Sequence, residues 1–182
     1  MVIEKAINTI MYCEKVKLDY DISRFLGFEY PEPSSCIIHQ VDEDKDLHEE
    51  YGGFPETYKF GNTIIRQKWW KEDEQDFEAI GDSLDMEVVT VSSILQPPGC
   101  TVPWHHDQFF LLKKKFPDRP QPVRALMVLE DWKIGHYMQL GDHVYHHWKA
   151  GDGYIIDEEL RHLGTNAGME DKYTLQVSGF LK

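Results

Sequence analysis

The chain has 182 residues, a formal net charge of −13, and 41% hydrophobic and 13% aromatic residues. This length suits one well-buried core and is short for two, so we expect a single domain over residues 1–182. The negative charge would repel phosphate backbones, which argues against nucleic acid as a partner.

No segment approaches the ~20 apolar residues that a membrane span requires. Acids and lysines are scattered through residues 1–17, which lack the uninterrupted apolar region of a secretory signal. The three cysteines, Cys13, Cys36 and Cys100, form no CxxC pair and are expected to be reduced thiols. We therefore expect a soluble, cytoplasmic protein without a membrane partner, and the oligomeric state stays open.

The first part of the chain, residues 1–85, has a mixed helical and irregular pattern. Residues 7–19 are rich enough in β-branched and aromatic side chains to predict a strand. Asp21 is in position to cap a short helix that Gly27 and Pro31 would end.

A second helix is predicted over residues 72–84, where three apolar side chains recur on one face. Trp69 and Trp70 precede this helix, and we expect them to lie in the core or at a packing point between helix and sheet. Residues 40–75 and 108–121 are predicted to be long irregular connections that could cover a site and select its substrate.

The second part of the chain, residues 86–182, has a β-rich pattern. Short segments of strand-forming residues follow one another between turn residues, with no helical period between them. This pattern predicts an antiparallel sandwich or barrel with the N-terminal helices packed outside. The segments cover residues 87–95, 101–107, 123–132, 136–141, 143–157 and 172–182.

A group of potential metal ligands lies in the segment 101–107, which ends in His105, His106 and Asp107. If this segment is a strand, His105 and Asp107 point to one face and His106 to the other. Two histidines and one carboxylate are the protein ligands of a non-haem iron(II) site, and His162 is the candidate for the second histidine.

A histidine followed two residues later by an acidic residue is a weak signal by itself. It occurs again at His48 and Glu50, within a charged run typical of a solvated surface. The prediction of a metal site therefore depends on the wider sequence, and a buried structural network of the same side chains is the alternative.

That wider sequence resembles a known family. Residues 98–107, 124–132, 148–157 and 162–179 are similar in content and order to the iron(II) and 2-oxoglutarate-dependent oxygenases. The nearest branches are the prolyl 4-hydroxylase-like and aspartyl/asparaginyl β-hydroxylase-like ones. The resemblance covers residues 86–182 and implies a double-stranded β-helix, or jelly-roll, core of the cupin-like kind.

The resemblance also implies roles for individual residues. His105, Asp107 and His162 would be the metal ligands and the catalytic centre, leaving three coordination positions for 2-oxoglutarate and dioxygen. Lys172, ten residues after His162, stands where the family binds the distal carboxylate of 2-oxoglutarate, and Thr174 matches the usual hydroxyl partner. Related halogenating enzymes lack the carboxylate ligand, so Asp107 favours hydroxylation.

Two further residues are candidates for cofactor binding. Arg124, on a predicted core strand, competes with Lys172 as the anchor of 2-oxoglutarate. Many family members have arginine at the position of Lys172, and a lysine there would bind as a point charge. Asn166 stands where members often carry a polar side chain near the site, but it could instead close the turn from Gly164 to Gly168.

The sequence therefore predicts an iron(II)/2-oxoglutarate-dependent dioxygenase, with ascorbate as a candidate additional cofactor. Its expected substrate is a peptide or protein side chain, or a small amino-acid-like molecule. One alternative is a cupin-like metal protein with a three-histidine site completed by His136, His143 or His146. The other is a non-catalytic jelly-roll binding module.

Overall fold

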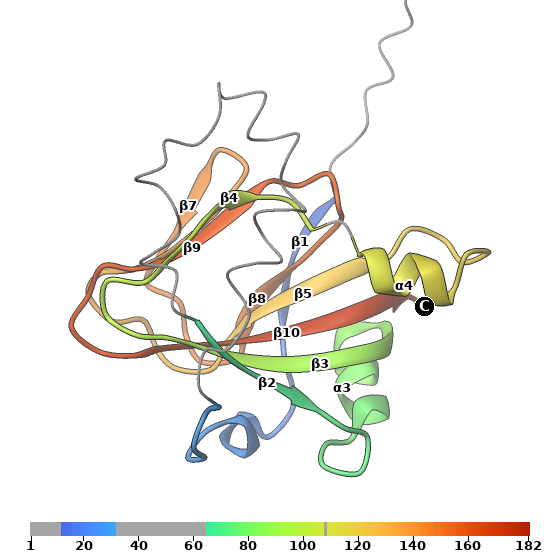
Figure 1. The fold of residues 1–182 in the computed structure, drawn as a ribbon, viewed down its shortest axis with the longest axis horizontal. Coiled ribbons are helices and arrows are strands. Elements are labelled where there is room, and N and C mark those ends of the chain that lie inside the picture. The colour runs from blue at the N-terminus through green and yellow to red at the C-terminus, as the bar shows by residue number, and fades with distance from the viewer. Residues whose placement is uncertain (1–11, 32–64, 108) are drawn as a thin grey trace, which may run out of the picture.

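Two antiparallel sheets form the framework of the protein (Figure 1). The computed structural model describes residues 12–31, 65–107 and 109–182. The larger sheet has the strand order β1 (Cys13–Lys17), β8 (Asp152–Ile156), β5 (Val123–Val128), β10 (Lys172–Leu181), β3 (Met86–Gln96) and β2 (Arg66–Trp70). The smaller has the order β4 (Thr101–His105), β9 (His162–Asn166), β6 (His136–Leu140) and β7 (His143–Tyr145). This arrangement confirms the mainly β, double-stranded β-helix fold expected from the sequence.

The larger sheet has two different faces because side chains alternate along each strand. Ala125 and Met127 of β5 belong to the main hydrophobic core on the outer face. Leu126, between them, packs with Met138 and Leu140 of the smaller sheet. The inner face of the larger sheet is therefore the one that the smaller sheet covers.

Strand β10 divides its residues between the same two faces. Leu175 and Val177 are fully buried in the outer core. Lys172, Thr174 and Gln176 alternate with them and therefore point between the sheets. Three polar side chains in succession on an inward face are unusual, and they suggest that a polar ligand binds between the sheets.

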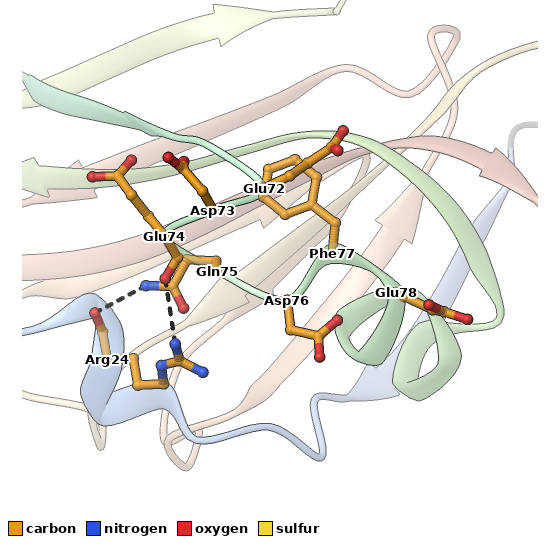
Figure 2. Close-up of a pocket in the computed structure, with 8 residues that line it drawn as sticks. All are labelled: Arg24, Glu72, Asp73, Glu74, Gln75, Asp76, Phe77 and Glu78. Atoms are coloured by element: carbon orange, nitrogen blue, oxygen red, sulfur yellow. Dashed lines mark hydrogen bonds between the residues drawn. The ribbon is translucent and has the colours of Figure 1, made fainter.

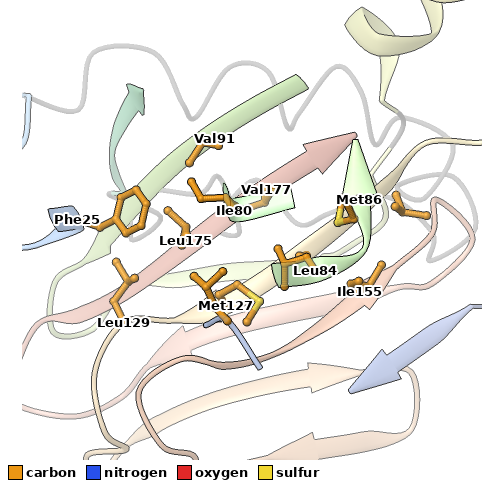
Figure 3. Packing of buried hydrophobic residues seen from close by; sticks show 13 residues of the cluster. Phe25, Ile80, Leu84, Met86, Val91, Met127, Leu129, Ile155, Leu175 and Val177 are labelled. Atoms are coloured by element: carbon orange, nitrogen blue, oxygen red, sulfur yellow. The ribbon is translucent and has the colours of Figure 1, made fainter. Parts of the chain in front are cut away.

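Helix α3 (Phe77–Leu84) covers the outer face of the larger sheet. The side chain of Asp76 caps it by accepting the backbone N–H of Ala79 at 3.0 Å. Ile80 and Leu84, four residues apart, lie on one face of the helix and pack into the main core (Figure 3). The amphipathic pattern of the segment thus fixes which side of the helix meets the sheet.

The helix is shorter than the predicted 72–84 and is joined tightly to β3. The residues before it form a turn, in which the N–H of Glu74 donates to the carbonyl of Lys71 at 3.0 Å. At Gly81 an added Cβ would lie 2.4 Å from the carbonyl oxygen of Met86. Only glycine allows the helix and the strand to approach this closely.

The N-terminal part packs on the same outer core. The strand predicted over residues 7–19 is present as β1 in its described portion. The 3₁₀ helix η1 (Ile22–Phe25) is capped by Asp21, as predicted, whose carboxylate accepts a backbone N–H at 3.2 Å. Phe25 is fully buried and meets Trp70 edge to face, with ring centroids 5.6 Å apart.

The structure corrects the predictions for two connections and for Trp69. The 40–75 segment contains β2, which pairs with β3, and the 108–121 segment contains helix α4 (Phe110–Lys115). Trp69 is 57% exposed and is not a core residue. Because side chains alternate along β2, Trp70 points to the main core on the outer face while Trp69, next to it, points to the other face.

Strands β1 and β2, from the predicted lead-in, form the two edges of the larger sheet. Cys13 is exposed and Cys100 is buried, and Cys36 lies outside the described residues, as do His48 and Glu50. In the described ranges, no helix combines the length and the apolar character that a membrane crossing demands.

We expect Ile80→Ala to lower the free energy of unfolding by about 2–5 kcal/mol, because it leaves a cavity at a fully buried site. The matched control is Ile134→Ala, since Ile134 is 83% exposed and its truncation should change stability by less than about 0.5 kcal/mol. Urea unfolding monitored by tryptophan fluorescence measures both. Equal losses would contradict the assignment of this face to the core.

Candidate metal centre

The pairing of β4 with β9 brings two histidines together. The antiparallel register sets His105 directly opposite His162. Both side chains are buried, and their ring centroids lie 4.3 Å apart. One potential ligand atom from each of His105, Asp107 and His162 lies within 4.8 Å of the other two. The structure thus brings the three predicted ligands into one cluster.

Asp107 reaches this cluster from beyond the end of β4. The predicted strand over residues 101–107 is shorter in the structure, because β4 ends at His105 and Asp107 lies beyond it. The pairing with β9 is also irregular between Val102 and His105. Strand alternation therefore does not orient Asp107, and its carboxylate must be held by side-chain contacts.

The ring of His162 is fixed in one orientation. Its Nδ1 lies 3.1 Å from the carbonyl oxygen of Leu160, so Nδ1 carries the proton and donates. Nε2 then faces Asp107 with its lone pair, 3.7 Å from Oδ2. Burial, reinforced by the neighbouring His105, lowers the pKa of His162 to about 4, which keeps the imidazole neutral.

The carboxylate of Asp107 has two unlike oxygens. Oδ1 forms an ion pair with Nη1 of Arg124 at 2.6 Å. Oδ2 is buried and has no hydrogen-bond partner among the described residues. Burial by itself would raise the pKa of Asp107, but the charge and hydrogen bond of Arg124, together with the neighbouring His162 and His105, more than offset it and hold the pKa below its usual value.

This donor set fits a divalent metal ion of the iron(II) class. Two imidazoles and one carboxylate are the ligands that such an ion takes from proteins in oxygenases. A bound ion would also give a partner to Oδ2 of Asp107, which has none among the described residues. These three residues could therefore hold the ion, and metal binding itself stays a prediction.

Lys172 is a buried cation on the inner face of β10. Its side chain is 3% exposed, and Nζ donates to the carbonyl oxygens of Tyr137 at 2.8 Å and Thr165 at 3.4 Å. Burial lowers the pKa of Lys172 to about 7, and no carboxylate pairs with it in the described part of the chain. An added Cβ at Gly164, two residues after His162, would lie 3.5 Å from this Nζ. Gly164 therefore separates Lys172 from the ligand His162 along β9, and it has no side chain to fill the space beside Nζ.

The other two predicted cofactor residues have different surroundings. Thr174 is half-buried and shares the inner face of β10 with Lys172. Asn166 is fully buried, and its Nδ2 donates to the carbonyl oxygens of Gln96 and Glu170 while its Oδ1 accepts the N–H of Gly168. These contacts give Asn166 the turn-closing role that the sequence left open.

The other histidines of the described ranges lie outside the cluster. Within the described ranges, the close group of potential ligands does not include His136, His143 or His146. His136 is buried, and its Nε2 contacts the carbonyl oxygen of Glu170 at 3.1 Å. His143 and His146 are exposed. The three-histidine alternative therefore gains no support from the geometry.

A hollow of about 490 Å³ lies beside the N-terminus of α3 and contains none of these ligands (Figure 2). The buried Gln75 in it already bonds to the carbonyl of Arg24 and to the hydroxyl of Tyr20. We therefore place the candidate site between the sheets. The hollow is lined by Arg24, Glu72, Asp73, Glu74, Gln75, Asp76, Phe77 and Glu78.

No protein-family model matches the chain, and no curated protein matches its sequence. Among solved structures it is similar to a prolyl-4-hydroxylase from Pseudomonas putida, with 15% identity, a TM-score of 0.52, and coverage of 95% of this chain and 94% of that one. The chain has the double-stranded β-helix fold. At this level of identity, the likeness to the hydroxylase shows the shared fold alone.

Two further similar structures cover less of the chain. A predicted oxalate decarboxylase from Thermotoga maritima has 17% identity and a TM-score of 0.42, over 64% of this chain and 81% of that one. An uncharacterised protein with a double-stranded β-helix domain from Klebsiella pneumoniae has 20% identity and a TM-score of 0.36, over 53% and 76%.

The lowered pKa of Lys172 makes stability depend on pH. The unfolded chain holds the proton up to about pH 10.5, whereas the folded protein releases it near pH 7, so this residue makes stability rise with pH between those values. Below pH 7 we expect Lys172→Met to unfold at a higher urea concentration than the wild type, because its free energy of unfolding is larger by up to a few kcal/mol. This difference in free energy should shrink toward pH 10.

The exposed Lys114 provides the control, since Lys114→Met should leave the pH profile of stability unchanged. If the free energies of unfolding of the wild type and Lys172→Met differed by the same amount from pH 6 to pH 10, Lys172 would have an ordinary pKa in the folded protein.

Proposed function

We propose that the protein is a non-haem iron(II)/2-oxoglutarate-dependent dioxygenase that hydroxylates its substrate. The observation that carries the proposal is the convergence of His105, Asp107 and His162 within 4.8 Å, with Oδ2 of Asp107 buried and unpartnered. The bound iron(II) would supply the oxidative chemistry, in which 2-oxoglutarate and dioxygen are consumed and a C–H bond of the substrate is hydroxylated.

The chain's own residues would prepare this chemistry in two ways. The Nδ1–H of His162 donates to the carbonyl of Leu160, which keeps Nε2 available as a ligand. The burial of His105 and His162 excludes bulk water from one side of the cluster.

We propose Lys172, and not Arg124, as the anchor of the distal carboxylate of 2-oxoglutarate. Arg124 already pairs with Asp107, whereas the buried Nζ of Lys172 donates to two backbone carbonyl oxygens, lies over the ring of Trp148 and has no carboxylate partner among the described residues. A buried cation without a counter-ion is costly, and a carboxylate would offset that cost. Thr174 shares the inner face of β10 and would add a hydroxyl donor beside it.

The proposed substrate is a peptide or protein side chain, or a small amino-acid-like molecule. The formal net charge of −13 favours a neutral or basic substrate over an acidic one. A screen of amino acids and peptides, read by succinate release, would identify the class, and ascorbate would be tested as an addition.

The proposal predicts a weak visible absorption band when iron(II) and 2-oxoglutarate are added without oxygen, because the keto acid chelates the metal. Asp107→Ala and His162→Ala should each abolish this band. His143→Ala is the matched control, since His143 is exposed and outside the cluster. A colourless wild-type protein at saturating ligand would rule the proposal out. Metal uptake that survives Asp107→Ala would instead favour the three-histidine alternative.

The role of Lys172 predicts a difference between two keto acids. We expect Lys172→Met to weaken 2-oxoglutarate binding to the metal-loaded protein by roughly 10- to 100-fold, as a charged hydrogen bond is lost. The five-carbon analogue 2-oxopentanoate has a methyl group in place of the distal carboxylate, so its affinity should not fall. Isothermal titration calorimetry measures both, and a parallel loss for the two acids would count against the anchor.

A further inference from the structure

The ion pair between Arg124 and Asp107 joins the two sheets at the candidate metal centre. Arg124 belongs to β5 of the larger sheet, whereas Asp107 follows β4 of the smaller sheet. The atoms Nη1 and Oδ1 lie 2.6 Å apart, and the side chains are only 17% and 11% exposed. Such a short, shielded contact between opposite charges is much stronger than a surface ion pair.

The guanidinium group is itself held on two other sides. Its Nε donates to the hydroxyl of Ser178 at 3.0 Å, and Ser178 is the residue directly opposite Arg124 on β10. Its Cζ lies over the ring of Phe109, 5.1 Å from the centroid. Arg124 therefore has a fixed position, and the position of Oδ1 of Asp107 is fixed by it.

We propose that Arg124 is a positioning residue that makes Asp107 a one-oxygen ligand. This inference rests on the proposed function, because it concerns the same metal centre. Arg124 occupies Oδ1 and leaves only Oδ2, on the side of His162, for the ion. Since Asp107 lies beyond the end of β4, the strand does not orient this side chain, and Arg124 does so instead.

The number of oxygens with which Asp107 binds the ion determines how many coordination positions remain for other ligands. A carboxylate that binds through both oxygens would take one of the three positions needed by 2-oxoglutarate and dioxygen. Removal of Arg124 frees Oδ1 for this second bond. The metal would still bind, but the keto acid would compete with Oδ1 for its place.

The test uses Co²⁺ as a stable probe for iron(II) and compares two affinities. Arg124→Met keeps the aliphatic stem and removes the charged group. We expect it to bind Co²⁺ while the Co²⁺-loaded variant binds 2-oxoglutarate roughly 10- to 100-fold more weakly than the wild type. The visible absorption of Co²⁺ should also change, as it reports the coordination of the ion.

Two further variants separate positioning from a general structural role. Arg124→Lys retains a charged donor and should recover most of the affinity for 2-oxoglutarate. Ser178→Ala removes the contact with Nε without altering a charge, and should weaken 2-oxoglutarate binding in the same direction by a smaller factor. This milder variant keeps the inference testable if Arg124→Met does not fold.

The matched control is Arg119→Met, which breaks the exposed ion pair with Glu87 and should leave both affinities unchanged. Wild-type affinity for 2-oxoglutarate in Arg124→Met and Ser178→Ala would overturn the inference and leave the proposed function standing. Parallel losses of Co²⁺ and 2-oxoglutarate in both variants would assign Arg124 to folding and overturn it too. A wild-type protein that takes up no Co²⁺ would overturn the proposed function itself.

Discussion

The pairing register of β4 with β9 is the constraint on which the candidate centre depends. It sets His105 opposite His162, and a shift by one residue would turn one of the two imidazoles to the opposite face. Gly164, two residues after His162, lies beside Lys172 of the larger sheet. Strand β9 therefore carries one potential ligand and also passes the buried cation.

Arg124 and Lys172, which both lie on the inner face of the larger sheet, have different electrostatic surroundings. Arg124 is neutralised by Asp107 and braced by Ser178, so its charge belongs to the cluster. Lys172 contacts carbonyl oxygens and the ring of Trp148 but no carboxylate in the described ranges, and its burial is an unfavourable contribution that the fold retains. Such uncompensated groups are typical of functional sites.

The sequence predicted the class of fold, because strand alternation and turn residues are local signals. It pointed to the three side chains that converge through the family resemblance, since alternation does not orient Asp107 beyond the end of β4. It did not predict the pairing of Arg124 with Asp107, which depends on how β5 faces the end of β4 across two sheets. Strand β2 was not predicted because its charged and amide residues give no clear alternation of polar and apolar side chains. The exposure of Trp69 follows from the position of β2 at the sheet edge, which no local pattern indicates.

The place of β10 in the larger sheet has a consequence for folding kinetics. This strand lies between β5 and β3, and its partners Ile94 and Val128 are distant from Thr174 in the sequence. Contacts between distant segments slow the folding of β proteins. A nascent polypeptide that has not yet reached Lys172 would present β3 and β5 as two open edges, a template for aggregation until the central strand is inserted.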